Sequence, residues 1–177
     1  GFAVMDADDS MKMFVTTNAN GLSNLTVVPM RSTTGGSFFS EASSGIPDDD
    51  PRSFYPPLVQ YPDSTSLQNP LYFATNRLWR STDDGSAWTA VSPVLSTTPE
   101  SEIFSGVDVI TAIAVAPGDP SRIYLGYYSG KVFATDGACD LPACWFEMDF
   151  GLPQAPVTSL AVNPFNKENV YATFSGF

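Results

Sequence analysis

The sequence predicts an all-β chain built from repeated units of four short strands. Its 177 residues combine 13% aromatic residues with 13 Gly and 15 Pro, a mixture that favours short strands joined by turns. No stretch of 11 or more residues shows the apolar stripe of an amphipathic helix. A segment near the C-terminus also repeats one found 47 residues earlier. Units of about 50 residues with four strands have the size of β-propeller blades, which makes a propeller the predicted fold.

The clearest repeat pairs Ile110–Pro117 with Val157–Pro164. Both segments continue through a polar turn into a second strand, at Ile123–Leu125 and Val170–Ala172, and the offset of 47 residues needs no gap. Weaker copies precede them. The aromatic residue of each second strand is separated from the next by 58, 52 and 47 residues, at Phe14, Tyr72, Tyr124 and Tyr171.

These repeats divide the chain into three blades and the start of a fourth, at residues 1–56, 57–108, 109–156 and 157–177. The third blade is expected to hold four strands, at Ile110–Ala116, Arg122–Tyr128, Lys131–Thr135 and Trp145–Met148. A propeller usually closes with about four to eight blades. We therefore expect the chain to be part of a larger propeller, completed by further sequence or by a partner.

One turn motif stands out in the second repeat: Ser81, Asp83, Gly85 and Trp88 match the pattern Ser/Thr-x-Asp-x-Gly-x-x-Trp between two strands. Asp83 can accept hydrogen bonds from the main chain of its own turn, and Ser81 can lock that turn further. Gly85 supplies a positive φ, and Trp88 covers the turn with an apolar ring. Each role is structural, so the motif predicts a rigid hairpin.

This motif, together with the repeats, resembles the BNR/Asp-box family of β-propellers, particularly its secreted microbial members. The family includes sialidases, xyloglucan-cleaving hydrolases, sortilin-like receptors and propellers without known activity. The resemblance implies that the Asp-box is a turn on the blade periphery, remote from any central site. Two degenerate copies are expected, one at Ala134–Trp145, stretched by a cysteine loop, and one at Thr16–Gly21.

Cysteine usage and a sequon favour an extracellular or periplasmic location. Cys139 and Cys144 are predicted to form a local disulfide, which requires an oxidising compartment, and two free thiols are the alternative. Asn24 begins an N-glycosylation sequon, which has meaning only in a secreted chain. The sequence has no signal peptide, no apolar stretch of membrane-spanning length and no initiating Met, so we expect a processed or partial piece.

Charge and composition exclude several kinds of function. The net charge of −11 would repel nucleic acid and disfavours binding to an anionic membrane. The absence of His removes histidine triads and the commonest transition-metal ligand. Asp48, Asp49 and Asp50 form a candidate cation site whose hard oxygen ligands would suit Ca²⁺, with a solvated acidic loop as the alternative. No cofactor is otherwise expected.

The predicted function is a non-catalytic extracellular propeller segment that serves as a scaffold or as an adhesion surface for a protein or glycan. No catalytic residue is assigned, because none of the five arginines lies in a sialidase-like motif and paired carboxylates are not apparent. Two alternatives stay open. The chain is an incomplete portion of a glycoside-hydrolase propeller, or it is a self-assembling subunit whose copies complete a homo-oligomer.

Overall fold

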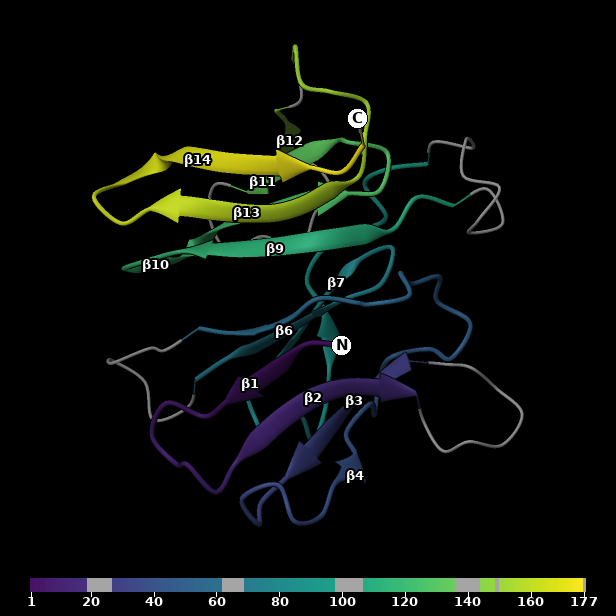
Figure 1. Cartoon of the computed structure of the whole chain (residues 1–177), viewed down its shortest axis with the longest axis vertical. Coiled ribbons are helices and arrows are strands. Elements are labelled where there is room, and N and C mark those ends of the chain that lie inside the picture. Colours follow the sequence, from purple (N-terminus) through teal and green to yellow (C-terminus); the bar gives the residue numbers. More distant parts are fainter. Residues whose placement is uncertain (19–26, 62–68, 98–106, 136–143, 149, 177) are drawn as a thin grey trace.

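The strands of the chain form four antiparallel sheets that follow one another in sequence and stack face to face (Figure 1). This computed structural model describes residues 1–18, 27–61, 69–97, 107–135, 144–148 and 150–176. Within these ranges no helix is long and apolar enough to cross a membrane. The sheet of β1 to β4 lies at one extreme of the stack, and the sheet of β13 and β14 lies at the other.

Each complete sheet is a meander in which every strand pairs with the next one along the chain. The first sheet contains β1 (Ala3–Met5), β2 (Met13–Asn18), β3 (Val27–Ser32) and β4 (Ser40–Glu41). The second contains β5 (Leu58–Gln60), β6 (Leu71–Ala74), β7 (Leu78–Ser81) and β8 (Thr89–Ala90). The third contains β9 (Ile110–Ala116), β10 (Asp119–Tyr127), β11 (Val132–Thr135) and β12 (Trp145–Glu147). The last contains β13 (Val157–Asn163) and β14 (Asn166–Phe174).

The prediction of three four-stranded units plus the start of a fourth is confirmed. In the third blade β11 and β12 are each one residue shorter than expected, at Val132–Thr135 and Trp145–Glu147. The larger difference is in β10, which begins at Asp119 and not at Arg122 and ends at Tyr127 and not at Tyr128. Asp119 already pairs with Ala116 across the turn at Gly118, whose φ of 78° lets the chain reverse there. The register then shifts before Ile123, so the sequence pattern alone detected only the regular part of the strand.

The 47-residue repeat is also a repeat of strand register. Leu125 pairs with Ile113 in the third sheet, and Ala172 pairs with Leu160 at the same offset in the fourth. Tyr124 opposite Ala114 and Tyr171 opposite Ala161 obey the same rule. Because side chains alternate between the two faces of a strand, equal registers place equivalent residues on equivalent faces.

Both faces of each inner sheet are buried against its neighbours. In β6, Leu71 and Phe73 pack in the core cluster shared with the first sheet, whereas Tyr72 and Ala74 pack in the cluster shared with the third. The same alternation in β10 directs Ile123, Leu125 and Tyr127 toward the second sheet and Tyr124 toward the fourth. Fully burying one such side chain contributes about 1.5–3 kcal/mol, so the stack is held mainly by these layers between sheets.

The third and fourth sheets approach closely at one glycine. A Cβ atom on Gly126 would lie 2.4 Å from Cγ1 of Val157, which a real side chain cannot do without a shift. Thr111 Oγ1 donates to the main-chain oxygen of Val157 at 2.6 Å. Glycine in β10 therefore sets the distance between these two sheets.

Charged and polar contacts join the same two sheets near the start of β10 and β14. Arg122, whose side chain is only 3% exposed, donates to Oε2 of Glu168 at 2.6 Å. The hydroxyl of Tyr124 donates to the main-chain oxygen of Lys167 at 2.6 Å. Lys167 Nζ in turn donates to Oδ2 of Asp119 at 2.7 Å.

We expect Glu168→Ala to lower the free energy of unfolding by about 1–2 kcal/mol, because it removes the carboxylate partner of a buried guanidinium. Urea unfolding followed by circular dichroism measures the loss. Glu147→Ala is the matched control, since its pair with Lys131 is longer, at 3.3 Å, and lies between exposed side chains within one sheet. That substitution should cost at most about 1 kcal/mol. Equal losses in the two variants would contradict a special contribution of the Arg122–Glu168 pair to the stability of the fold.

Asp119 should make the stability of the chain depend on acid pH. Lys167, together with Ser121, lowers the pKa of Asp119 to about 2. A carboxyl group with a lowered pKa stabilises the fold above its unfolded pKa of about 3.9 and loses that effect as pH falls through the folded pKa. The stability difference between wild type and Asp119→Asn should therefore shrink between about pH 4 and about pH 2. Urea titrations across this range test it, and a constant difference would contradict it.

Candidate functional site

The Asp-box forms the hairpin between β7 and β8 and closes on itself. Ser81 Oγ donates to Oδ1 of Asp83 at 2.7 Å and accepts the main-chain N–H of Gly85 at 2.9 Å. The N–H of Ala87 donates to the same Asp83 oxygen at 2.9 Å. Asp84 and Gly85 both take a positive φ, of 58° and 76°. The four residues of the motif therefore serve local turn geometry.

The chemistry of Asp83 agrees with this role. The main-chain N–H of Ala87 lowers the pKa of the Asp83 carboxyl, and the hydrogen bond from Ser81 lowers it further. Together these hydrogen bonds outweigh partial burial, which raises the pKa. A general acid needs the opposite shift, toward neutral pH. The carboxylate therefore stays ionised and acts as the acceptor at the centre of its turn.

The Asp-box hairpin also fastens the second blade to the first. Trp88 is buried, and its indole Nε1–H donates to the main-chain oxygen of Ala42 at 2.6 Å. Lys12 pairs with the carboxylate of Asp84 at 2.6 Å, and Arg31 donates to the main-chain oxygen of Asp84 at 3.0 Å. The motif therefore carries contacts between blades as well as its own turn.

A second turn with the same hydrogen bonds joins β3 to β4. Ser32 Oγ accepts the N–H groups of Thr34, at 3.2 Å, and of Gly36, at 3.0 Å. Thr34 Oγ1 accepts the N–H of Phe38 at 3.0 Å, as Asp83 accepts that of Ala87. Gly35 and Gly36, with φ of 62° and 86°, take the places of Asp84 and Gly85. The offset between the two turns is 49 residues.

This second turn corrects the expected copy at Thr16–Gly21. Thr16 lies in β2, the second strand of its blade, whereas the Asp-box of the second blade lies between the third and fourth strands. Residues 19–21 lie outside the described ranges. Sequence comparison missed Ser32–Phe39 because Thr34 replaces the motif's aspartate, although its hydroxyl can accept the same hydrogen bond. The sequence did hold one signal of this turn, because Ser32 and Gly36 have the same spacing as Ser81 and Gly85.

The copy expected at Ala134–Trp145 lies at the corresponding hairpin of the third blade, between β11 and β12. Residues 136–143, which include Cys139, lie outside the described ranges. Cys144 is disulfide-bonded, and Trp145 is buried in the core between the second and third blades. Asn24 also lies outside the described ranges.

The three aspartates of the predicted cation site, Asp48, Asp49 and Asp50, lie in different surroundings. Asp50 is buried, and its carboxylate binds Nε of Arg77 at 3.2 Å and the hydroxyl of Thr75 at 3.0 Å. The other two aspartates are exposed, and the described residues hold no group of three or more His, Cys, Asp or Glu that could bind a metal. The Asp50 carboxylate is thus already paired with a guanidinium.

Arg52 ties this loop to the first blade and fixes its shape. Its guanidinium donates to the main-chain oxygens of Val27 at 2.9 Å, Asp50 at 3.0 Å and Pro47 at 2.6 Å. Directly after it, Phe54 and Tyr55 are 69% and 59% exposed, with ring centroids 4.8 Å apart and planes almost perpendicular. A loop held by the hydrogen bonds of Arg52 thus presents two aromatic rings to solvent.

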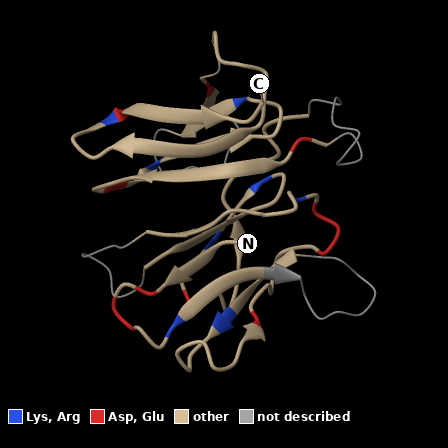
Figure 2. Ribbon diagram, in the orientation of Figure 1, with Lys and Arg blue, Asp and Glu red and all other residues tan. Residues whose placement is uncertain are grey.

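This loop lies at the end of the blades where the segments linking successive blades gather. In a meander, the hairpins between first and second and between third and fourth strands share one end, and the remaining connections share the other. Figure 2 shows that the Asp and Glu residues lie mostly in segments that connect strands, at both ends of the blades. Lys and Arg are few and scattered. The aromatic pair, exposed at the linking end beside the exposed Asp48 and Asp49, is a candidate recognition surface.

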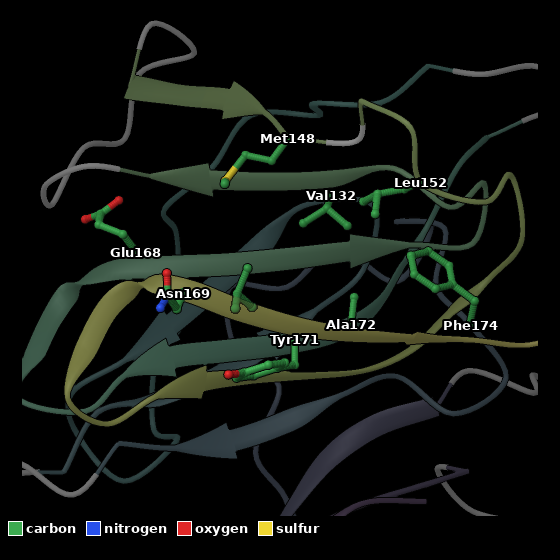
Figure 3. Close-up of a pocket in the computed structure, with 9 residues that line it drawn as sticks. Val132, Met148, Leu152, Glu168, Asn169, Tyr171, Ala172 and Phe174 are labelled. Atoms are coloured by element: carbon green, nitrogen blue, oxygen red, sulfur yellow. The ribbon is translucent and has the colours of Figure 1, made fainter.

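A pocket of about 400 Å³ opens between the third blade and β14 (Figure 3). Its walls are mainly apolar, with Val132 and Met148 from the third blade facing Ala172 and Phe174 from β14. Glu168, at one end, is the carboxylate paired with Arg122. The pocket thus offers an apolar volume and no free charged group among its described lining residues.

The buried carboxylates are likewise held by donors. Burial raises the pKa of Asp6, but hydrogen bonds from Gln60 and from main-chain N–H groups outweigh it, so the pKa is lowered. Asp108 accepts the hydroxyls of Ser96 and Ser129, both at 2.6 Å, and two main-chain N–H groups. These hydrogen bonds hold the segments that carry the two carboxylates in place.

Two tryptophans allow the Asp-box contact to be measured. Trp88→Phe removes the indole donor to Ala42 and leaves a buried carbonyl unpaired, which should cost about 1–3 kcal/mol beyond the change of ring size. Trp145→Phe is the matched control, because its buried Nε1–H has no hydrogen-bond partner among the described residues. Chemical denaturation of both variants gives the difference. Equal losses would show that the Trp88 hydrogen bond contributes nothing to joining the blades.

Comparison with known proteins bears on the fold. No family model matches the chain, and no curated protein matches it. It is similar to a GH74 enzyme of Niastella koreensis, with 20% sequence identity and a TM-score of 0.64 over 96% of this chain. It is also similar to a GH74 xyloglucanase of Xanthomonas campestris, with 15% identity and a TM-score of 0.65 over 98% of this chain.

The chain covers 24% and 26% of those two proteins, about a quarter of their length. At such identities the likeness shows the fold alone, and both neighbours are β-propeller proteins. The chain therefore adopts β-propeller blades, three complete and one represented by its first two strands.

Proposed function

We propose that this chain is a non-catalytic, extracellular propeller segment of the BNR/Asp-box type, whose linking end recognises a glycan or protein partner. The propeller fold supports the scaffold role. The turn chemistry of Ser81–Trp88 and its counterpart at Ser32–Phe39 supports the Asp-box assignment, and the disulfide-bonded Cys144 supports an oxidising compartment.

The observation that carries recognition is the exposed pair of Phe54 and Tyr55 on a rigid loop. Solvent-exposed aromatic rings are costly to leave uncovered and are enriched at binding surfaces. Arg52 and Asp50 order the loop before any ligand arrives, so binding would lose little conformational entropy. Flat rings can stack on the apolar face of a sugar, which makes a glycan the ligand to test first.

The test is a glycan array that includes xyloglucan oligosaccharides and sialosides, probed with the labelled chain. We expect the double variant Phe54→Ala/Tyr55→Ala to lose about tenfold or more in affinity for any glycan bound, while its melting temperature is unchanged. Phe38→Ala is the control, because Phe38 is 70% exposed on the opposite end of the first blade. Binding that survives the double variant, or an array without any signal, would contradict glycan recognition at this pair.

A second candidate is a portion of a glycoside-hydrolase propeller, supported by the similarity to two GH74 structures over nearly the whole chain. Against it, the buried carboxylates of Asp6, Asp50 and Asp108 are each engaged by neighbouring donors. Release of reducing sugar from xyloglucan by the chain, abolished by replacing one or two acidic residues, would establish this candidate in place of the first.

A further inference from the structure

The loop that presents Phe54 and Tyr55 also presents two carboxylates to solvent. Asp48 and Asp49 are exposed, and neither side chain accepts a hydrogen bond or forms an ion pair within the described residues. Their neighbour Asp50 differs, because it is buried and paired with Arg77. Two aromatic rings and two uncommitted negative charges therefore share one loop.

Arg52 holds the carboxylates and the rings close together. Its guanidinium donates to the main-chain oxygen of Asp48 at 3.3 Å, and Phe54 follows two residues after it. Burial lowers the pKa of Arg52, while the charges of Asp50, Asp48 and Asp49 act in the opposite direction. Both exposed carboxylates thus lie near enough to the guanidinium for their charges to act on it.

The positive charges at this loop are already engaged. Arg52 donates to four main-chain oxygens, those of Val27, Pro47, Asp48 and Asp50. Arg77 binds the Asp50 carboxylate at 3.2 Å. A ligand with a negative charge would therefore find no free guanidinium on this loop and would meet two carboxylates of like charge.

Rings and carboxylates together suit a sugar that carries an ammonium group. The face of an aromatic ring attracts a cation, and an exposed carboxylate adds an ion pair. The planes of Phe54 and Tyr55 meet at 88°, so their faces point in two different directions. One face can stack on a sugar ring while the carboxylates meet its amine.

A basic peptide is the competing ligand of the same charge. Residues 42–57 contain no strand, so the loop has no strand edge with which the main chain of a peptide could pair. A sugar requires only ring faces and polar groups, and the loop presents both. The observations therefore favour the sugar.

We propose that this loop binds a protonated amino sugar, such as a glucosamine unit of an oligosaccharide. The sugar ring stacks on the pair of Phe54 and Tyr55, and its ammonium group pairs with Asp48 and Asp49. This inference rests on the proposed glycan recognition at the aromatic pair and names the class of glycan. It excludes acidic sugars, such as sialosides, as preferred ligands.

The test compares two hexasaccharides of the same linkage by isothermal titration calorimetry, one of glucosamine and one of N-acetylglucosamine. Acetylation removes the positive charge and keeps the sugar backbone. At mildly acidic pH and low salt, we expect the glucosamine oligomer to bind about fivefold more tightly, because each exposed ion pair contributes a modest factor. The preference should vanish near 1 M salt, where the Debye length falls to about 3 Å.

Two charge variants locate the source of the preference. Asp48→Asn/Asp49→Asn should bind both oligomers with the affinity that wild type has for the acetylated one. Asp8→Asn/Glu147→Gln is the matched control, since it removes two exposed carboxylates in other segments and should keep the preference. Thermal melting followed by circular dichroism checks that both variants remain folded. Phe54→Ala/Tyr55→Ala should weaken binding of both oligomers about tenfold.

Equal binding of the two oligomers by wild type would overturn this inference and leave glycan recognition at the aromatic pair standing. A preference that both charge variants lose equally would show general attraction to an acidic protein, and would also overturn it. Binding of hexalysine that exceeds binding of the glucosamine oligomer and depends on Asp48 and Asp49 would overturn it in favour of a basic peptide. Loss of the preference in Asp48→Asn/Asp49→Asn alone supports it.

Discussion

The sheets in this chain are apolar on two faces, and a single sheet cannot bury both by itself. Leu71 and Phe73 face one neighbour while Tyr72 and Ala74 face the other, so the second blade needs the first and the third on either side. Hydrophobic burial is the dominant favourable contribution to folding, and here nearly all of it lies between blades. The pairing of strands sets the shape of each blade, but an inner blade is stable only when neighbouring blades cover both of its apolar faces.

The polar features of the molecule are organised around the same requirement. The Asp-box closes a hairpin with its own side chains and then reaches the preceding blade through Trp88 and Asp84. Arg122 and Glu168 join the third blade to the fourth in a comparable way. The buried guanidinium of Arg122 thus meets a carboxylate from the adjacent sheet, which helps to keep these layers in register as well as in contact.

The surface proposed for glycan or protein binding lies where this stacking leaves side chains exposed. At the linking end, Arg52 and Asp50 hold a loop against the first blade and its two aromatic rings remain in solvent. This surface arises from loop order on a rigid scaffold.

The sequence by itself determined the blades, because strand content, the 47-residue repeat and the Asp-box of Ser81–Trp88 depend on local patterns that survive in one dimension. Even the shared register of Tyr124 and Tyr171 follows from an ungapped offset. Tertiary structure decided how the acidic loop is used, since nothing near Asp50 in sequence predicts that Arg77, 27 residues later, will bind it. It also revealed the turn at Ser32–Phe39, because hydrogen bonding depends on an acceptor in the right place and a threonine hydroxyl can replace a carboxylate there. The pocket at β14 could not be read from the sequence for the same reason: it is a space between blades, defined only when they pack.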